Sequence, residues 1–165
     1  MKLDHIAYRV TDRHETAQFF RTALEYTVGE EFDIAFDDGS TTECYALLPP
    51  VTPVVNVRIG HEVFISDGSP DSIVGKWVEE RGGGGIHHMA YKVKDMEETV
   101  ASWRGNGVEF LTEDIIDCPE DNLRQIFTKP LEELGGVIIE LIERGDKGFC
   151  RNSVKHLMKS TKELK

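Results

Sequence analysis

The stretch LDHIAYRVTDRHETAQFFR, at residues 3–21, decides the fold because a second copy, IHHMAYKVKDMEETVASWR, lies at residues 86–104. The two stretches are identical at eight of nineteen positions, without a gap and at a constant offset of 83. Self-similarity of this kind indicates a duplicated structural module. The expected organisation is a single domain, 1–165, made of module one at 1–76, a glycine-rich linker at 77–85 and module two at 86–165, which ends in a helix.

Each copy begins with a predicted strand and a predicted helix. Leu3–Val10 and Ile86–Val93 are rich in β-branched and aromatic residues, which is typical of strands. Asp12 and Asp95 occupy helix N-cap positions, each with a glutamate three residues later. Further strands are expected at 43–48, 62–66, 124–128 and 137–142, and further helices at 72–80 and 153–162. This order predicts an α+β fold, with two tandem βαβββ modules forming a curled mixed sheet around a cleft.

Composition narrows the partners and the compartment. The formal net charge of -11 argues against a nucleic-acid or anionic-membrane partner, since both require a basic surface. The N-terminus lacks the apolar stretch of a signal peptide and no apolar run could span a bilayer, so we expect a cytoplasmic protein. Three cysteines without a CxxC pair are expected to be reduced thiols. The expected partner is a small-molecule substrate, with a homodimer as the candidate assembly.

Two histidines and one glutamate carry the predicted chemistry. Side chains alternate across a strand, so His5 and His88 take equivalent positions in the two repeats, each two residues before an alanine. Glu140 lies within the apolar run 137–142, where an unpaired carboxylate would cost several kcal/mol. Two imidazoles and one carboxylate form the ligand set of mononuclear non-haem iron(II) sites. We predict one divalent metal in the cleft, bound by these three residues, while His87 should face the other way.

The first module should offer a fourth ligand where the second module offers Glu140. Aligning VIIE, at 137–140, on the closing strand EVFIS, at 62–66, places Phe64 at that point. Phenylalanine cannot bind a metal, so Phe64 should line the cleft near the ion without touching it. The remaining coordination positions would then be open to substrate, water or O₂.

Several motifs resemble the vicinal oxygen chelate superfamily, and the resemblance covers essentially the whole chain. They are LDHIAYRV (3–10), GGGIHHMAYKV (83–93), GVEFL (107–111) and VIIELIER (137–144). The second half is similar to the C-terminal domain of 4-hydroxyphenylpyruvate dioxygenases, notably in RQIFTKP and IIELIERGDKGF. This resemblance implies an Fe(II)-dependent dioxygenase that acts on a 2-oxo acid. It further implies that Gln125 is a catalytic residue that orients the substrate, and that Phe149 and Asn152 form a substrate-binding gate.

The first half and the linker are similar to methylmalonyl-CoA epimerases in SPDSIVGKWVEERGGGGIHHMAYKV, at 69–93. That resemblance implies an epimerase, or a glyoxalase-like isomerase or lyase, with an acyl-CoA substrate and Co(II), Mn(II), Ni(II) or Zn(II) in place of iron. Glu43 would then be the catalytic acid or base. A third hypothesis is a non-catalytic, small-molecule-binding resistance protein of the same superfamily. Phe64 favours the dioxygenase, because the epimerases usually place a metal ligand at the matching position.

Overall fold

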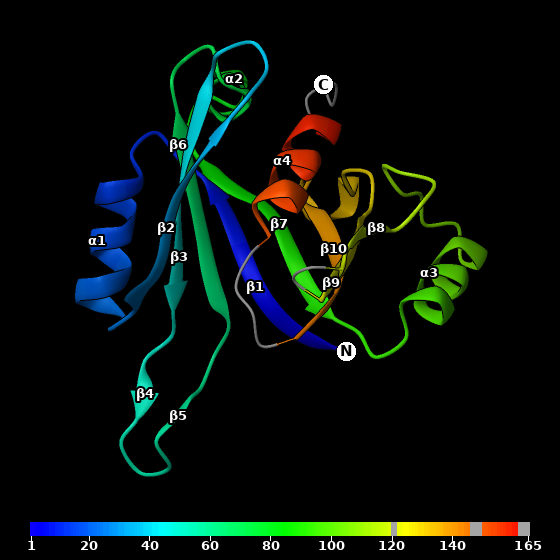
Figure 1. Cartoon of the computed structure of the whole chain (residues 1–165), viewed down its shortest axis with the longest axis horizontal. Helices are drawn as coiled ribbons and strands as arrows, with labels where there is room; N and C mark the ends of the chain where they lie inside the picture. The colour runs from blue at the N-terminus through cyan, green and yellow to red at the C-terminus, as the bar shows by residue number, and fades with distance from the viewer. Residues whose placement is uncertain (120–121, 146–149, 162–165) are drawn as a thin grey trace. The chain divides into compact units, whose positions relative to one another are not determined.

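The computed structural model describes residues 1–119, 122–145 and 150–161. The chain contains both strands and helices, with runs of strands between the helices, and the predicted α+β class is confirmed (Figure 1). Every helix and strand predicted from the sequence is present, with its ends within two residues of the expected ones. In the part of the chain that the structure describes, no helix is long and apolar enough to cross a membrane.

The chain divides into two compact units, His5–His87 and His88–Lys165, and Met1–Asp4 joins the second. We call these the N-terminal unit and the C-terminal unit. The elements of the first are β1 (Lys2–Arg9, which begins in the other unit), α1 (Arg13–Ala23), β2 (Thr27–Ala35), β3 (Thr41–Leu48), β4 (Val51–Thr52), β5 (Val57–Arg58), β6 (Glu62–Gly68) and α2 (Ile73–Glu80). Its sheet has the order β2-β3-β6-β1, in which β1 and β6 are parallel and the other pairs antiparallel.

The C-terminal unit repeats this arrangement. Its elements are β7 (Gly85–Lys92, which begins in the other unit), α3 (Met96–Gly105), β8 (Ile116–Cys118), β9 (Leu123–Phe127), a short 3₁₀ helix (Glu132–Leu134), β10 (Ile138–Arg144) and α4 (Arg151–Ser160). The strand order is β7-β10-β9-β8, with β7 and β10 parallel and the other pairs antiparallel. The predicted duplication into two βαβββ modules is therefore confirmed by the strand pairing within each unit.

Equivalent residues begin the first helix of each module. The predicted N-caps are confirmed, since the Asp12 carboxylate accepts from the backbone N–H of Glu15, and Asp95 accepts from Glu98. A carboxylate on the last strand also accepts from the first helical N–H. Asp67 accepts from Arg13 at 2.8 Å, and Glu143 accepts from Met96 at 2.8 Å. These paired contacts join each helix to the closing strand of its own unit.

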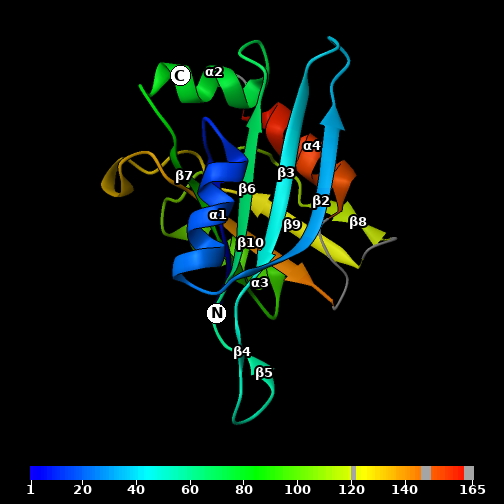
Figure 2. The same cartoon turned by 90° about the vertical axis from the view of Figure 1, so that its left-hand side faces the viewer.

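Helix α1 covers one face of its sheet, where Ala17 packs against Leu47, Val63 and Ile65 (Figure 2). Helix α3 covers the matching face of the C-terminal unit, where Met96 and Val100 pack against Leu141. Each sheet therefore buries an apolar face under its own helix. The opposite face of each sheet carries the predicted metal ligands, because side chains alternate along a strand.

Some elements carry weak sequence signals and were not predicted. Strands β2, β4, β5 and β8 are among them, and α2 takes up residues 77–80 of the predicted linker. The β4–β5 ribbon projects from the N-terminal unit (Figure 1), and its turn residue Val54 is 92% exposed. The ribbon was not predicted because its sequence, VTPVVNVR at 51–58, has no regular alternation of apolar and polar residues.

The expectation of reduced cysteines is wrong for one pair. The structure joins Cys118, at the end of β8, to Cys150, the N-cap of α4, in a disulfide. These residues are 32 positions apart, and only the packing of α4 beside β8 brings them together. Cys44 is free and buried, as expected of a structural thiol.

Candidate metal centre

The C-terminal unit contains two of the three predicted ligands in contact. The parallel register of β7 and β10 pairs His88 with Ile138 and Ala90 with Glu140. This register places the two ligands diagonally on one face, with His88 Nε2 3.2 Å from Glu140 Oε2. His88 is 5% exposed and Glu140 is 2% exposed. An imidazole nitrogen and a carboxylate oxygen at this separation fit the donor set of a divalent transition metal.

The surroundings of this pair are apolar. The His88 ring meets the Phe127 ring edge-on, with centroids 5.8 Å apart. Phe127 and Ile138 also pack against Leu157 of α4, so this helix covers the sheet face that carries Glu140. Burying an ionised carboxylate among such groups is costly unless an opposite charge or a metal compensates it. Apolar packing alone therefore does not explain why a carboxylate is buried at this position.

The third predicted ligand, His5, lies in the N-terminal unit. It is 2% exposed and lies on the face of β1 opposite α1. The register of β1 and β6 pairs Ala7 with Phe64, just as Ala90 pairs with Glu140 in the other unit. Because Ala7 and Ala90 are equivalent repeat positions, Phe64 takes the place of Glu140. The strand pairing thus agrees with the sequence alignment of the two closing strands.

Phe64 lies on the same sheet face as His5 and is 4% exposed. Its ring centroid is 5.9 Å from that of Phe32 on β2. The N-terminal unit therefore has an apolar aromatic side chain at the position where the C-terminal unit has the Glu140 carboxylate. His87, the weaker ligand candidate, is buried against Trp77, with ring centroids 5.6 Å apart.

Gln125 is a buried amide on the ligand-bearing face of the C-terminal unit. It lies on β9 opposite Ile142 of β10, and Ile142 is two residues after Glu140, so Gln125 and Glu140 share one face of the sheet. It is 5% exposed, and among the described residues its Nε2 has no hydrogen-bond partner. A buried amide without a partner is costly in a finished core and is the group that a bound ligand can satisfy.

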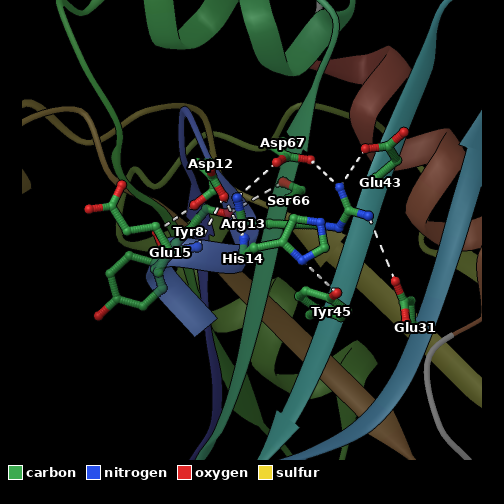
Figure 3. Close-up of polar contacts among 11 residues, drawn as sticks. Tyr8, Asp12, Arg13, His14, Glu15, Glu31, Glu43, Tyr45, Ser66 and Asp67 are labelled. Carbon is green, nitrogen blue, oxygen red and sulfur yellow. Dashed lines mark hydrogen bonds and ion pairs between the residues drawn. The ribbon is translucent and has the colours of Figure 1, made fainter. Parts of the chain in front are cut away.

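Glu43 is not on the face where the sequence interpretation needs it. It pairs with Asp67 in the β3–β6 register, so it shares the α1 side of the sheet and points away from the face of His5 and Phe64. Figure 3 shows Glu43 and Asp67 around the Arg13 guanidinium, which donates to Glu43 at 2.5 Å and to Asp67 at 3.1 Å. This position argues against Glu43 as the acid or base of a site at His5.

The two predicted gate residues have different outcomes. Asn152 lies in the first turn of α4 with an exposed side chain. Phe149 lies outside the described residues. Arg9 was missed by the sequence interpretation, although the same alternation that singled out His5 places Arg9 four residues later on its face. It is a buried arginine, 2% exposed.

Comparison with known proteins places the chain in a superfamily. The family profile of the Glyoxalase/Bleomycin resistance protein/Dioxygenase superfamily matches residues 4–128, most of the chain. The chain therefore belongs to this superfamily. The resemblance to vicinal oxygen chelate proteins that its motifs predicted is confirmed.

Individual relatives fall into two groups. The chain is 28% identical to 4-hydroxyphenylpyruvate dioxygenase from Sus scrofa, over 98% of this chain and 49% of that protein. It thus spans about half the length of this relative. A 4-hydroxymandelate synthase variant from Streptomyces coelicolor has a TM-score of 0.81 at 20% identity, over 98% of this chain and 53% of that one. Methylmalonyl-CoA epimerase from Mycobacterium tuberculosis has a TM-score of 0.64 at 23% identity, over 87% and 88%.

Proposed function

We propose that this chain is a metal-dependent enzyme that oxidises a small 2-oxo acid with O₂, and that His5, His88 and Glu140 hold one divalent ion, with Fe(II) favoured. The observation that carries the proposal is the buried contact between His88 and Glu140 at 3.2 Å. Two buried imidazoles and a buried carboxylate could hold a metal ion. They match the two-histidine, one-carboxylate set that leaves coordination positions open.

The repeat supports His5 as the third ligand. His5 and His88 take equivalent positions in the two modules, at the constant offset of 83 residues. Both are buried, and each lies on the face of its sheet opposite the helix of its own unit. The repeat that supplies one histidine ligand therefore supplies a second at the matching position.

The remaining residues have distinct roles in this proposal. An Fe(II) ion held by His5, His88 and Glu140 would act as a Lewis acid toward the 2-oxo acid and would supply the electrons needed to activate O₂. The Gln125 amide would donate to a polar atom of the substrate and so fix its orientation. Phe64 would contact the apolar part of the substrate. Helix α4, packed on the Glu140 face through Leu157, would keep water from the reacting atoms.

The alternative is an epimerase acting on an acyl-CoA. One observation favours it, namely that the stretch SPDSIVGKWVEERGGGGIHHMAYKV, at 69–93, resembles methylmalonyl-CoA epimerases. Against it stands the ion pair of Glu43 with Arg13, on the face opposite His5. An epimerase needs a base within about 3 Å of the substrate carbon acid or one water away. We therefore favour the oxidative reaction.

Anaerobic reconstitution with Fe(II) tests the proposal. Adding phenylpyruvate or an aliphatic 2-oxo acid to the iron-loaded protein is expected to produce a visible charge-transfer band, and admitting air should start O₂ consumption. Deuterium exchange of methylmalonyl-CoA by the Co(II)-loaded protein, without any O₂ uptake, would instead establish the epimerase. Iron loading with neither band nor uptake for any 2-oxo acid would contradict the dioxygenase.

Phe64→Glu is expected to add a fourth ligand and to tighten Zn(II) binding by at least about tenfold, because zinc prefers four protein ligands in closed sites. Phe64→Leu is the matched control, since it keeps an apolar side chain without a donor atom. Competition with a chromophoric chelator measures both affinities. Equal Zn(II) affinities for the two variants would mean that Phe64 does not face the metal.

A further inference from the structure

The sheet face of the N-terminal unit that lies opposite α1 carries polar side chains at the two ends of β1. His5, Ala7 and Arg9 alternate onto this face, and all three are buried. Four residues of strand separate the Cα atoms of His5 and Arg9 by about 13 Å. The face therefore begins with a predicted metal ligand and ends with a buried cation.

The middle of this face is apolar. The strand registers place Ala7, Phe64 and Ala46 side by side on β1, β6 and β3. Both alanines are small and buried, and the Phe64 ring lies against Phe32. Among the described strand residues, the side chains that β1, β6 and β3 place on this face between the His5 row and the Arg9 row are apolar.

The far end of the face is built around Arg9. Its guanidinium lies over the Trp77 ring, 5.6 Å from the centroid, and Arg81 lies 4.6 Å from the same ring. Burial, together with the nearby charge of Arg81, lowers the pKa of Arg9 to about 9. Arg9 is 2% exposed, and the planar fork of a guanidinium is the geometry that binds a carboxylate through two hydrogen bonds.

An independent observation at this end also indicates a ligand. Thr42 is fully buried on the same face of β3, two residues from Cys44, which lies opposite Ser66 beside Arg9. In the described part of the chain, its Oγ1 has no hydrogen-bond partner. A buried hydroxyl is normally satisfied, so an acceptor or donor supplied by a bound molecule would complete it.

We propose that Arg9, with Thr42, binds an anionic group at the distal end of the substrate, so that the substrate is a 2-oxo acid with an apolar middle and a second carboxylate. This inference rests on the proposed function, because His5 supplies the metal end of the site. It names the substrate class that the reaction alone leaves open. Arg9 is a specificity-determining residue, remote from the reacting atoms.

Binding to the Co(II)-loaded protein tests this without turnover. Calorimetry compares matched ligands, 2-oxoadipate against 2-oxohexanoate, and 4-carboxyphenylpyruvate against phenylpyruvate. The wild type is expected to bind the diacid of at least one pair about tenfold or more tightly, as a charge-assisted hydrogen bond allows. Arg9→Gln should abolish that preference and leave monoacid binding within about twofold.

Two variants sharpen the comparison. Arg81→Gln removes the exposed cation that also contacts the Trp77 ring and should keep the diacid preference. Arg9→Lys keeps the charge but not the fork, so it should retain part of the preference. It also serves if Arg9→Gln does not fold. The proposal is overturned if the wild type shows no preference in either pair, or if Arg9→Gln keeps it or weakens both ligands equally.

A metal-free readout separates this inference from the proposed function. In a Trp103→Phe background, Trp77 emission is titrated with 4-methylbenzoate, which has a carboxylate but no chelating head. A saturable change that Arg9→Gln removes is expected even without metal, because Arg9 lies over the Trp77 ring. No saturable change would count against Arg9, whatever the metal does. Failure to bind Co(II), with the emission change intact, would overturn the proposed function alone.

Discussion

Replacing Glu140 with alanine is expected to abolish stoichiometric binding of a divalent ion. His88→Ala and His5→Ala should do the same, because each leaves only two of the three protein ligands. When the concentration of the free ion is about 100 times its dissociation constant, binding stabilises the folded wild type by about 2.7 kcal/mol. The variants should not gain this stabilisation. Metal content after dialysis and the metal-dependent shift in unfolding temperature measure the two effects.

Matched controls separate ligand loss from general damage. Glu43→Ala removes a partly exposed carboxylate on the opposite face, and His156→Ala removes an exposed imidazole on α4. Both should bind one ion per chain with unchanged affinity. If Glu140→Ala binds metal as tightly as the wild type, Glu140 is not a ligand and the proposed centre is wrong.

Gln125→Ala is expected to lower kcat/KM for a 2-oxo acid by about 10- to 100-fold, because one hydrogen bond to the substrate is lost. Glu43→Gln should change it by less than about twofold, since Glu43 pairs with Arg13 on the other face of the sheet. Steady-state O₂ uptake measures both. Gln18→Ala, which changes an exposed glutamine on α1, is the control.

The same two variants discriminate between the candidate reactions. Loss of a general base costs about 10²- to 10⁴-fold, so in an epimerase Glu43→Gln would be the severe change and Gln125→Ala the mild one. If Glu43→Gln lowers the rate and Gln125→Ala does not, the proposed oxidation with O₂ is wrong. That result would also mean that the ion pair with Arg13 opens during the reaction.

Much of the molecule could be predicted from local pattern. The repeat of residues 3–21 at 86–104 predicted two equivalent modules, and the apolar run around Glu140 marked a carboxylate that needs compensation. The equivalence of Phe64 and Glu140 followed from aligning the closing strands, and the strand registers of the two units agree with it. Strand alternation is a property of the chain itself, so such inferences need no knowledge of distant neighbours.

Pairing between distant segments decided the rest. Glu43 and Cys44 are adjacent, and both faces of β3 carry apolar and polar side chains, so only the register with β6 shows which of the two shares the face of His5. The same holds for the Cys118–Cys150 disulfide, which depends on α4 packing beside β8. A one-residue difference in register reverses every side chain, and register is set by long-range contacts.

The sequence by itself therefore determined the duplicated α+β architecture and the three ligand positions as a prediction, because these follow from repetition and alternation. Only the tertiary structure decided that Glu43 pairs with Arg13, that the Gln125 amide is buried without a partner, and that Arg9 is buried over Trp77. Burial and pairing depend on which elements cover a face. That is a property of the folded chain as a whole, which no local pattern contains.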